Sequence, residues 1–564
     1  MVQPGSPTGP DEQGPGPVPP PPPPGPTAGE PVASAPDPAT RPLAYPGDAD
    51  AEPAVVPGKR RGLLAGGIAA AVLVAGSGAV FAWQALDGGG TQPHDVLPAD
   101  AVGYVRLDLD PSAGQKIEAF RFLQNFPVFT EATGITDENV DLRERFVDEL
   151  AEAGGCDIDF ADDVEPWVGE RIGAAMLPPS DDTGAPGYVV ALQASDEEAA
   201  TAAIDRILGC GGAEAEAGGL GRAYADGYLL VTDTQENADA YAEAAADSSL
   251  ADNPEFVEAM DQLGEQGIAS AWFSGTALFD TFAGSADSFG VDTGADGSGD
   301  LPSLDDAREL IDETYRSIAL SVRFDDRYAE LASVVTGSSY HALDGGGVEA
   351  AVPDDAALFL GAHGAGQYLR DNWDATLESV PDGAELLDDL EAETGLVLPD
   401  DLATVLGEDL AIAVDAGDLD TDDPDAFFGL QAGARVATDP DAFADLWERI
   451  QELAADSGES LDGLPLHTTD DGFVVATSED YADELLDGGG LADTDAYRTA
   501  VAGADEADSV FFVNVDAVSE QLLAAGGDSL GDAERQSIEA LQALGMAMNI
   551  DDGHLEFSLR VTTD

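Results

Sequence analysis

The feature that most constrains the fold is a set of five sequence blocks that occur twice, in the same order, in the larger C-terminal part of the chain. The paired blocks are 97–105 and 352–360, 163–170 and 401–408, 226–232 and 471–477, 250–252 and 491–493, and 324–326 and 550–552. Chance is a poor account of five blocks in unchanged order. The sequence therefore predicts a tandem duplication, with repeat 1 at 97–337 and repeat 2 at 352–564, joined by a linker at 338–351.

Each repeat contains stretches with the period of a β-strand. In 317–324, Ile318, Leu320 and Val322 alternate with small or polar residues, and 554–561 near the C-terminus repeats this alternation. Such a period of two predicts antiparallel strands with a buried apolar face and a face in contact with water.

Helices are expected between these strands. Ser195 followed by Glu198 has the pattern of a capping box, and Thr438 opens the equivalent stretch of repeat 2. The simplest assembly is an α+β fold in which each repeat forms its own antiparallel sheet, with helices on the apolar face of that sheet.

The N-terminal part has a different composition. Residues 1–58 hold 19 of the 35 prolines and few large side chains, which predicts a disordered cytoplasmic tail. The tail could bind a proline-recognition domain or act as a solvated spacer.

A long uncharged stretch follows this tail. Residues 62–86 carry no charged side chain, and as a helix of ~37 Å they would cross a bilayer. Lys59, Arg60 and Arg61 precede the stretch, which predicts a single-pass transmembrane helix with the N-terminus in the cytoplasm. Residues 87–96 are then expected to be a linker. This arrangement predicts a plasma-membrane protein whose C-terminal domain lies on the extracellular side.

Charge excludes one class of function. The chain has a formal net charge of −90, and residues 87–564 contain 18 Lys and Arg against 105 Asp and Glu. Because nucleic acids are bound largely through Lys and Arg at phosphates, we expect no nucleic-acid partner. We expect weak, diffuse cation binding that screens the self-repulsion.

Two cysteines, Cys156 and Cys210, lie in the part expected outside the membrane. Thiols tend to oxidise there, so we predict a disulfide between them, with two buried free thiols as the alternative. No histidine or further cysteine is spaced to make either one a zinc ligand.

No sequence motif identifies catalytic, cofactor-binding or metal-binding residues. The nucleophile-elbow pattern at 527–531 is preceded by residues that predict a helix, whereas the elbow requires a strand. The acidic run from Asp418 to Asp422 begins like a calcium loop, but Asp423 and Gly429 occupy the positions that need Gly and Glu. The five histidines are scattered.

The opening LPADAVGYVRLDLDPSAGQKIEAFRFLQNFP and the block VEPWVGERIG, together with the tail and the uncharged stretch, resemble a family from high-GC Gram-positive bacteria. That family is known as domain of unknown function number thirty-three fifty-two. The resemblance covers nearly all of residues 97–564 and implies a location in the cell envelope. It supplies no substrate, cofactor or catalytic residue.

These observations favour a membrane-anchored, non-enzymatic protein whose outer domain binds or scaffolds an envelope protein or wall component. Two alternatives stay open. The first is a hydrolase of cell-wall polymers that uses carboxylates, and the second is a cation-responsive envelope sensor.

Overall fold

The computed structural model describes residues 90–563, except 110–112, 134–140, 149–157, 180–184, 211–219, 286–303, 344–347, most of 374–389, 416–430, 459–460, 527–529 and single positions at 142, 146, 349, 393 and 462. The predicted tail (1–58) and membrane span (62–86) lie outside these residues. Among the described helices, none combines the length and the apolar character needed to cross a bilayer. The linker at 338–351 is described only in part.

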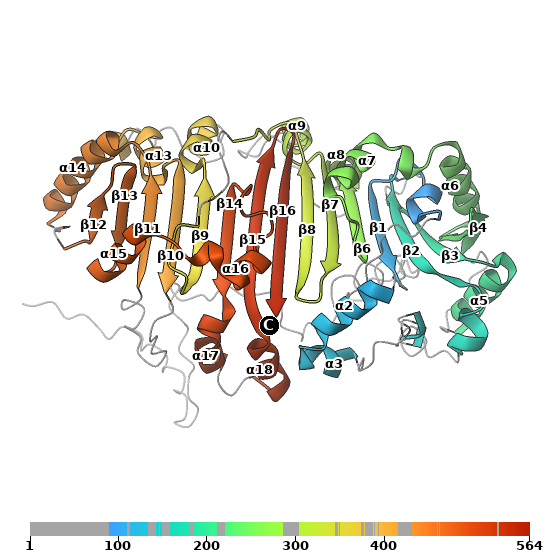
Figure 1. The fold of residues 1–564 in the computed structure, drawn as a ribbon. Coiled ribbons are helices and arrows are strands. Elements are labelled where there is room, and N and C mark those ends of the chain that lie inside the picture. The colour runs from blue at the N-terminus through green and yellow to red at the C-terminus, as the bar shows by residue number, and fades with distance from the viewer. Residues whose placement is uncertain are drawn as a thin grey trace, which may run out of the picture. The chain divides into compact units, whose positions relative to one another are not determined.

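The described chain forms one antiparallel sheet of 16 strands (Figure 1). The strands before residue 340 are β1 (Gly103–Asp108), β2 (Val168–Leu177), β3 (Gly187–Ala194), β4 (Gly221–Ala225), β5 (Tyr228–Thr232), β6 (Ala269–Ser274), β7 (Ser317–Phe324) and β8 (Tyr328–Thr336). The strands after it are β9 (Ala356–His363), β10 (Asp409–Asp415), β11 (Ala432–Ala437), β12 (Leu466–Thr468), β13 (Gly472–Ala476), β14 (Ser509–Asn514), β15 (Leu541–Asp551) and β16 (His554–Thr563).

The strand order across the sheet is β12-β13-β11-β10-β9-β14-β15-β16-β8-β7-β6-β1-β2-β3-β5-β4. Read outward from the centre, each half has the same order of eight strands, so β8 corresponds to β16 and β1 to β9. The two halves meet where β16 pairs with β8, with Arg560 opposite Glu330 and Ser558 opposite Ala332.

The predicted fold class is therefore wrong in its architecture. The chain forms one continuous sheet instead of two separate sheets. A repeat that ended in β8 or β16 alone would leave a row of unpaired N–H and C=O groups along that edge. Pairing the two edges satisfies both rows, and this partnership cannot be read from either repeat by itself.

The helices before residue 340 are α2 (Ala113–Leu123), α3 (Pro127–Thr133), α5 (Glu197–Cys210), α6 (Gln235–Asp247), α7 (Pro254–Leu263), α8 (Gly275–Ser285) and α9 (Leu304–Thr314). Those after it are α10 (Ala365–Asp371), α13 (Asp400–Leu406), α14 (Pro440–Ser457), α15 (Glu479–Asp487), α16 (Asp495–Ala500), α17 (Val515–Gly526) and α18 (Asp532–Glu539). Short helical turns occur at Pro93–Val96 (η2), Phe160–Val164 (η3), Leu250–Asp252 (η4) and Leu491–Asp493 (η7).

One face of the sheet, which we call the helix-covered face, carries the main core. In the first half, Phe256 of α7 packs edge-on against Trp272 of β6, with ring centroids 5.6 Å apart. In the second half, Tyr497 of α16 packs in the same way against Phe512 of β14 at 5.3 Å. A Cβ at Gly545 of β15 would lie 2.3 Å from the carbonyl oxygen of Ala500, so glycine allows α16 to approach the strands.

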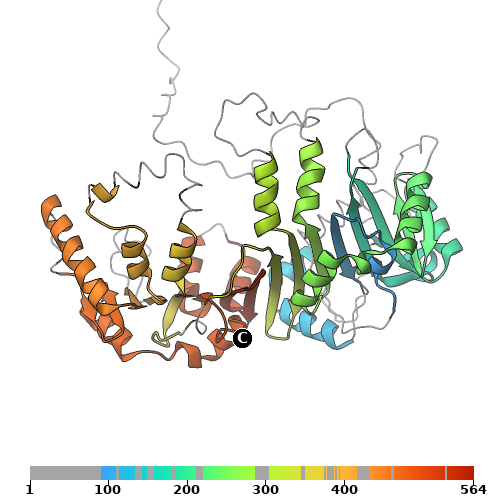
Figure 2. The same cartoon turned by 90° about the horizontal axis from the view of Figure 1, so that it is seen from above.

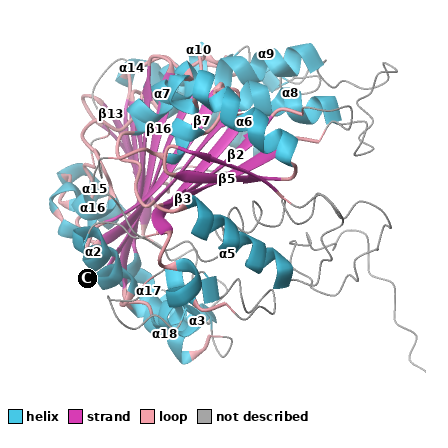
Figure 3. Ribbon diagram, turned by 90° about the vertical axis from the view of Figure 1, so that its right-hand side faces the viewer, coloured by secondary structure: helices cyan, strands magenta, loops and turns pink. Residues whose placement is uncertain are grey.

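The opposite face has helices mainly at its margins, and Figure 3 shows helices on both sides of the strands. Helix α5 packs near Leu229 and Val231 at one outer end, and α14 packs through Phe443 on Phe473 at the other. Helix α2 covers Phe324 at the end of β7. Figure 2 shows α8 and α9 side by side, projecting from the sheet.

The predicted placement of helices on a single apolar face is also wrong. Ser317, Ala319 and Ser321 of β7 are at most 1% exposed and lie on the helix-covered face, where small side chains leave room for the aromatic residues of α7 and β6. Ile318 and Leu320 point the other way and are only half-buried.

Candidate functional site

One feature that the core does not explain is the apolar surface on the face opposite α7 and α16. A row of directly opposed residues crosses seven neighbouring strands, from β7 through β8, β16, β15, β14 and β9 to β10. We call it the apolar row; its residues are Val322, Leu331, Leu559, Met546, Phe511, Leu360 and Ile412.

Every side chain of the apolar row is hydrophobic, and none is buried. Leu331 and Leu360 are each 37% exposed, and the other five are half-buried. In contrast, Ala319 and Trp272 on the helix-covered face are fully buried. Seven strands at a spacing of ~4.8 Å give the row a length of ~29 Å.

A second apolar row runs beside the first, two residues further along each strand. It contains Phe324, Ala329, Val561, Leu544, Val513, Leu358 and Val414. Phe324 is buried beneath α2, and Ala329 and Val561 pack against the same cluster, as Val322 of the first row does. The other four are half-buried. We call the two rows together the open apolar face. A contiguous group of apolar side chains that stay in partial contact with water is typical of binding sites.

The helix-covered face contains a smaller, polar cavity of about 280 Å³ where the two halves meet. Its floor includes Glu330 of β8 with Ser558 and Arg560 of β16. The end of α7 at Leu263 and the turn around Gly503 after α16 form its sides.

Glu330 is the centre of a buried charge network in this cavity. The glutamate is 6% exposed, and its Oε1 accepts hydrogen bonds from Nε of Arg560 at 2.9 Å and from Oγ of Ser558 at 2.8 Å. Its Oε2 lies 3.4 Å from Nη1 of Arg323. Arg323 in turn donates through Nε to the carbonyl oxygen of Glu265 at 2.8 Å, beyond the end of α7.

Arg560 of the second half contacts residues of both halves. Its guanidinium lies 4.2 Å from the ring centroid of Tyr328, and its Nη1 donates to the carbonyl oxygen of Thr499 in α16 at 3.4 Å. Since both oxygens of Glu330 are engaged by side chains of β7 and β16, the network ties the two halves together. The Ser558 hydroxyl, which donates to this carboxylate, is part of the same junction.

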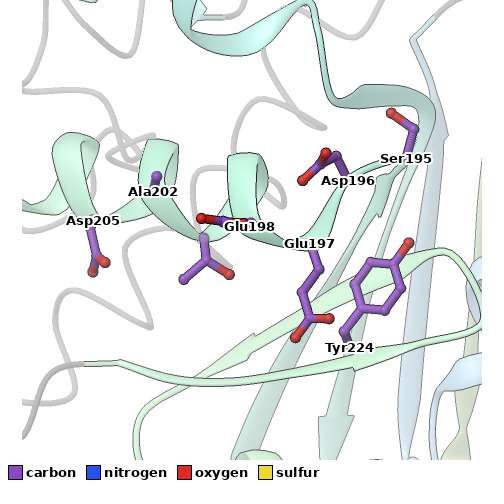
Figure 4. A pocket seen from close by; sticks show the side chains of 8 residues that line it. Ser195, Asp196, Glu197, Glu198, Ala202, Asp205 and Tyr224 are labelled. Carbon is purple, nitrogen blue, oxygen red and sulfur yellow. The ribbon is translucent and has the colours of Figure 1, made fainter.

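A third hollow, of about 780 Å³, lies at the start of α5 (Figure 4). Asp196, Glu197, Glu198 and Asp205 line it, and their side chains do not converge on one point. Among the described residues, no group of three or more His, Cys, Asp or Glu side chains is arranged to hold a metal ion. The Tyr224 hydroxyl at its edge donates to the carbonyl oxygen of Ala194 at 2.7 Å.

The predicted site residues are placed as follows. Cys156 and the acidic run 418–422 lie outside the described residues. Cys210 is the last residue of α5, and the predicted disulfide stays a prediction. Residues before the elbow pattern at 527–531 form helix α17, so the strand that an elbow requires is not there.

The described histidines make local polar contacts. Nδ1 of His363 lies 2.6 Å from Asp409, and Nε2 of His467 lies 2.9 Å from Glu479. Burial lowers the pKa of His94 below its ordinary value, with nearby Asp95 acting in the opposite direction.

Sequence reasoning missed the open apolar face, although the signal was present. The alternation in 317–324 and 554–561 identifies one apolar side of each strand, and that side was expected to be buried. The structure leaves that side half-buried, except that Phe324 is buried beneath α2.

Comparison with known proteins identifies the family of this chain but does not identify an activity. No curated protein matches the chain, and no solved structure matches it. The family model DUF3352, described as a protein of unknown function, matches residues 64–562, which is most of the chain. The chain therefore belongs to the family DUF3352, a domain of unknown function.

Proposed function

We propose that this protein is a non-enzymatic binding protein of the cell envelope that holds an apolar ligand on the open apolar face. The observation that carries the proposal is the apolar row, in which seven opposed side chains on seven strands are all hydrophobic and none is buried. Leaving such a surface in water is unfavourable by roughly 25 cal/mol for each Å² that a ligand could cover.

The polar cavity supports catalysis less well. A carboxylate hydrolase needs one carboxyl group free to protonate the leaving group and a second to activate water or attack. Both oxygens of Glu330 are engaged by Arg323, Arg560 and Ser558, which suits a structural junction. The alternatives of a wall-polymer hydrolase and a cation-responsive sensor have no comparable observation in their favour.

The cellular location rests on sequence alone. The basic residues Lys59, Arg60 and Arg61 before the uncharged stretch 62–86 favour the plasma membrane, with residues 97–564 on the outer side. Protease digestion of intact cells tests this placement. Cleavage within 97–564 is expected, and protection of that part until the cells are lysed would contradict it.

Binding of an apolar fluorescent dye tests the proposed function. We expect the folded chain to enhance the fluorescence of an anilinonaphthalene sulfonate dye, and the double variant Leu331→Glu/Leu360→Glu to lose most of that enhancement. Val257→Glu is the matched control, because Val257 lies on α7 and is also 37% exposed. Equal enhancement by the double variant and the wild type would refute the proposal.

A further inference from the structure

We propose that the ligand of the open apolar face is the hydrocarbon chain of a membrane lipid, lying across the strands along the apolar row. This inference rests on the proposed binding function and specifies its ligand class. It follows from the apolar side chains of the face, the absence of free hydrogen-bonding groups in its central strands, its length and the negative charge of the chain.

The central strands of the open apolar face have no free backbone hydrogen-bonding groups for a ligand. The backbone N–H and C=O groups of β7, β8, β16, β15, β14 and β9 are engaged in ladders with strands on both sides. Neither row carries a polar side chain. A peptide or a glycan laid on this surface would lose water from its polar groups without gaining partners, which is costly. A hydrocarbon chain has no such groups.

The length of the row fits lipid chains. Val322 packs against the cluster beneath α2, and from Leu331 to Ile412 the row measures ~24 Å over six strands. Half of a ~30 Å hydrocarbon core corresponds to ~15 Å for one acyl chain, so the row can hold one acyl chain along its whole length.

The surface is also adaptable. Met546 lies in the apolar row, and Met548, two residues further along β15, is half-buried on the same side of the strand. Flexible, polarizable methionine side chains adjust to ligands of different shape, which suits chains of variable length and unsaturation.

Charge argues against a second copy of this chain as the occupant. Residues 87–564 carry 105 acidic against 18 basic side chains, so two copies brought face to face would repel each other strongly. The same field disfavours anionic headgroups. We therefore expect neutral or zwitterionic lipids to bind more tightly than anionic lipids with the same chain.

The test uses the purified full-length chain and displacement of the bound dye by single-chain lipids below their micelle concentrations. Monoacylglycerols with 8, 12 and 16 carbons form the length series. Lysophosphatidylcholine and lysophosphatidylglycerol with 16 carbons form the headgroup series. A fully buried CH₂ is worth about fourfold in affinity, and we expect about twofold per CH₂ here because only one side of the chain is covered. The affinity should then rise by about 250-fold from 8 to 16 carbons.

The outcomes separate this inference from the proposed function. Dye binding that depends on Leu331 and Leu360, without displacement by any chain, would leave the binding function standing and overturn the lipid inference. An affinity that does not change with chain length would also overturn it. Dye binding unaffected by the double variant would refute the proposed function itself. Because the length series uses only the wild-type chain, it remains decisive even if the double variant fails to fold.

Discussion

Removal of the Glu330 carboxylate should weaken the joint between the two halves of the sheet. In Glu330→Ala, Arg323 and Arg560 keep their positive charges at a site where the glutamate was 6% exposed, and they lose their shared acceptor. Breaking a buried ion pair by removing one partner costs about 3–5 kcal/mol, since the remaining charge is left uncompensated. We therefore expect the free energy of unfolding to fall by about 3–5 kcal/mol.

Urea unfolding, monitored by circular dichroism, measures this change in the free energy of unfolding. The chain is strongly acidic, so removing any carboxylate also relieves some repulsion, and this effect needs its own control. Glu556→Gln provides this control. Glu556 lies on β16, on the same face of the sheet as Glu330, with 47% of its side chain exposed, and one of its oxygens lies 3.5 Å from Nε2 of His554. The control should change stability by less than about 1 kcal/mol. A loss below 1 kcal/mol in Glu330→Ala would refute the view that this network joins the halves.

Three further predictions concern the core, a buried carboxylate and the cysteines. Trp272→Ala should cost about 3–5 kcal/mol in urea unfolding because the indole is fully buried, whereas Leu331→Ala on the open apolar face should cost less than about 1.5 kcal/mol; equal losses would contradict the assignment of the two faces. Burial raises the pKa of Asp508 above its ordinary value of 3.8, with the N–H of Ile550 acting in the opposite direction, so its contribution favours the folded state less as the pH rises through this range. Stability measured from pH 3.5 to 7 should therefore fall more steeply with pH in the wild type than in Asp508→Asn, and identical slopes would contradict this. A disulfide between Cys156 and Cys210 would stabilise the fold by about 4 kcal/mol, and alkylation without reductant followed by mass spectrometry should find neither thiol modified.

The sequence was informative about strands and much less so about how they assemble. The alternation of Ile318 and Leu320 with Ser317 and Ala319 predicts a strand, and 317–324 is β7. Alternation identifies the two sides of a strand but does not say which side a helix will cover. Here α7 covers the side of Ser317 and Ala319, because small side chains make room for Phe256.

The joint between the halves could not be predicted for a different reason. β8 and β16 are the last strands of their repeats, and nothing local in either sequence identifies the other as its partner. Only the pairing brings Arg560 beside Glu330, residues 230 positions apart in the chain. The candidate site was missed for the same reason, because the apolar row exists only after strands from both halves have been placed side by side.

The measurement that tests the central claim most directly is photolabelling with a 16-carbon monoacylglycerol that carries a diazirine in its chain. After illumination of the full-length chain, labelled peptides are identified by mass spectrometry. We expect labels within β15, β16, β8 and β9, which contribute Met546, Leu559, Leu331 and Leu360. These labels should disappear when unlabelled lipid is in excess. Labels confined to α6, α7, α15 or α16, or a pattern that excess lipid leaves unchanged, would contradict the claim.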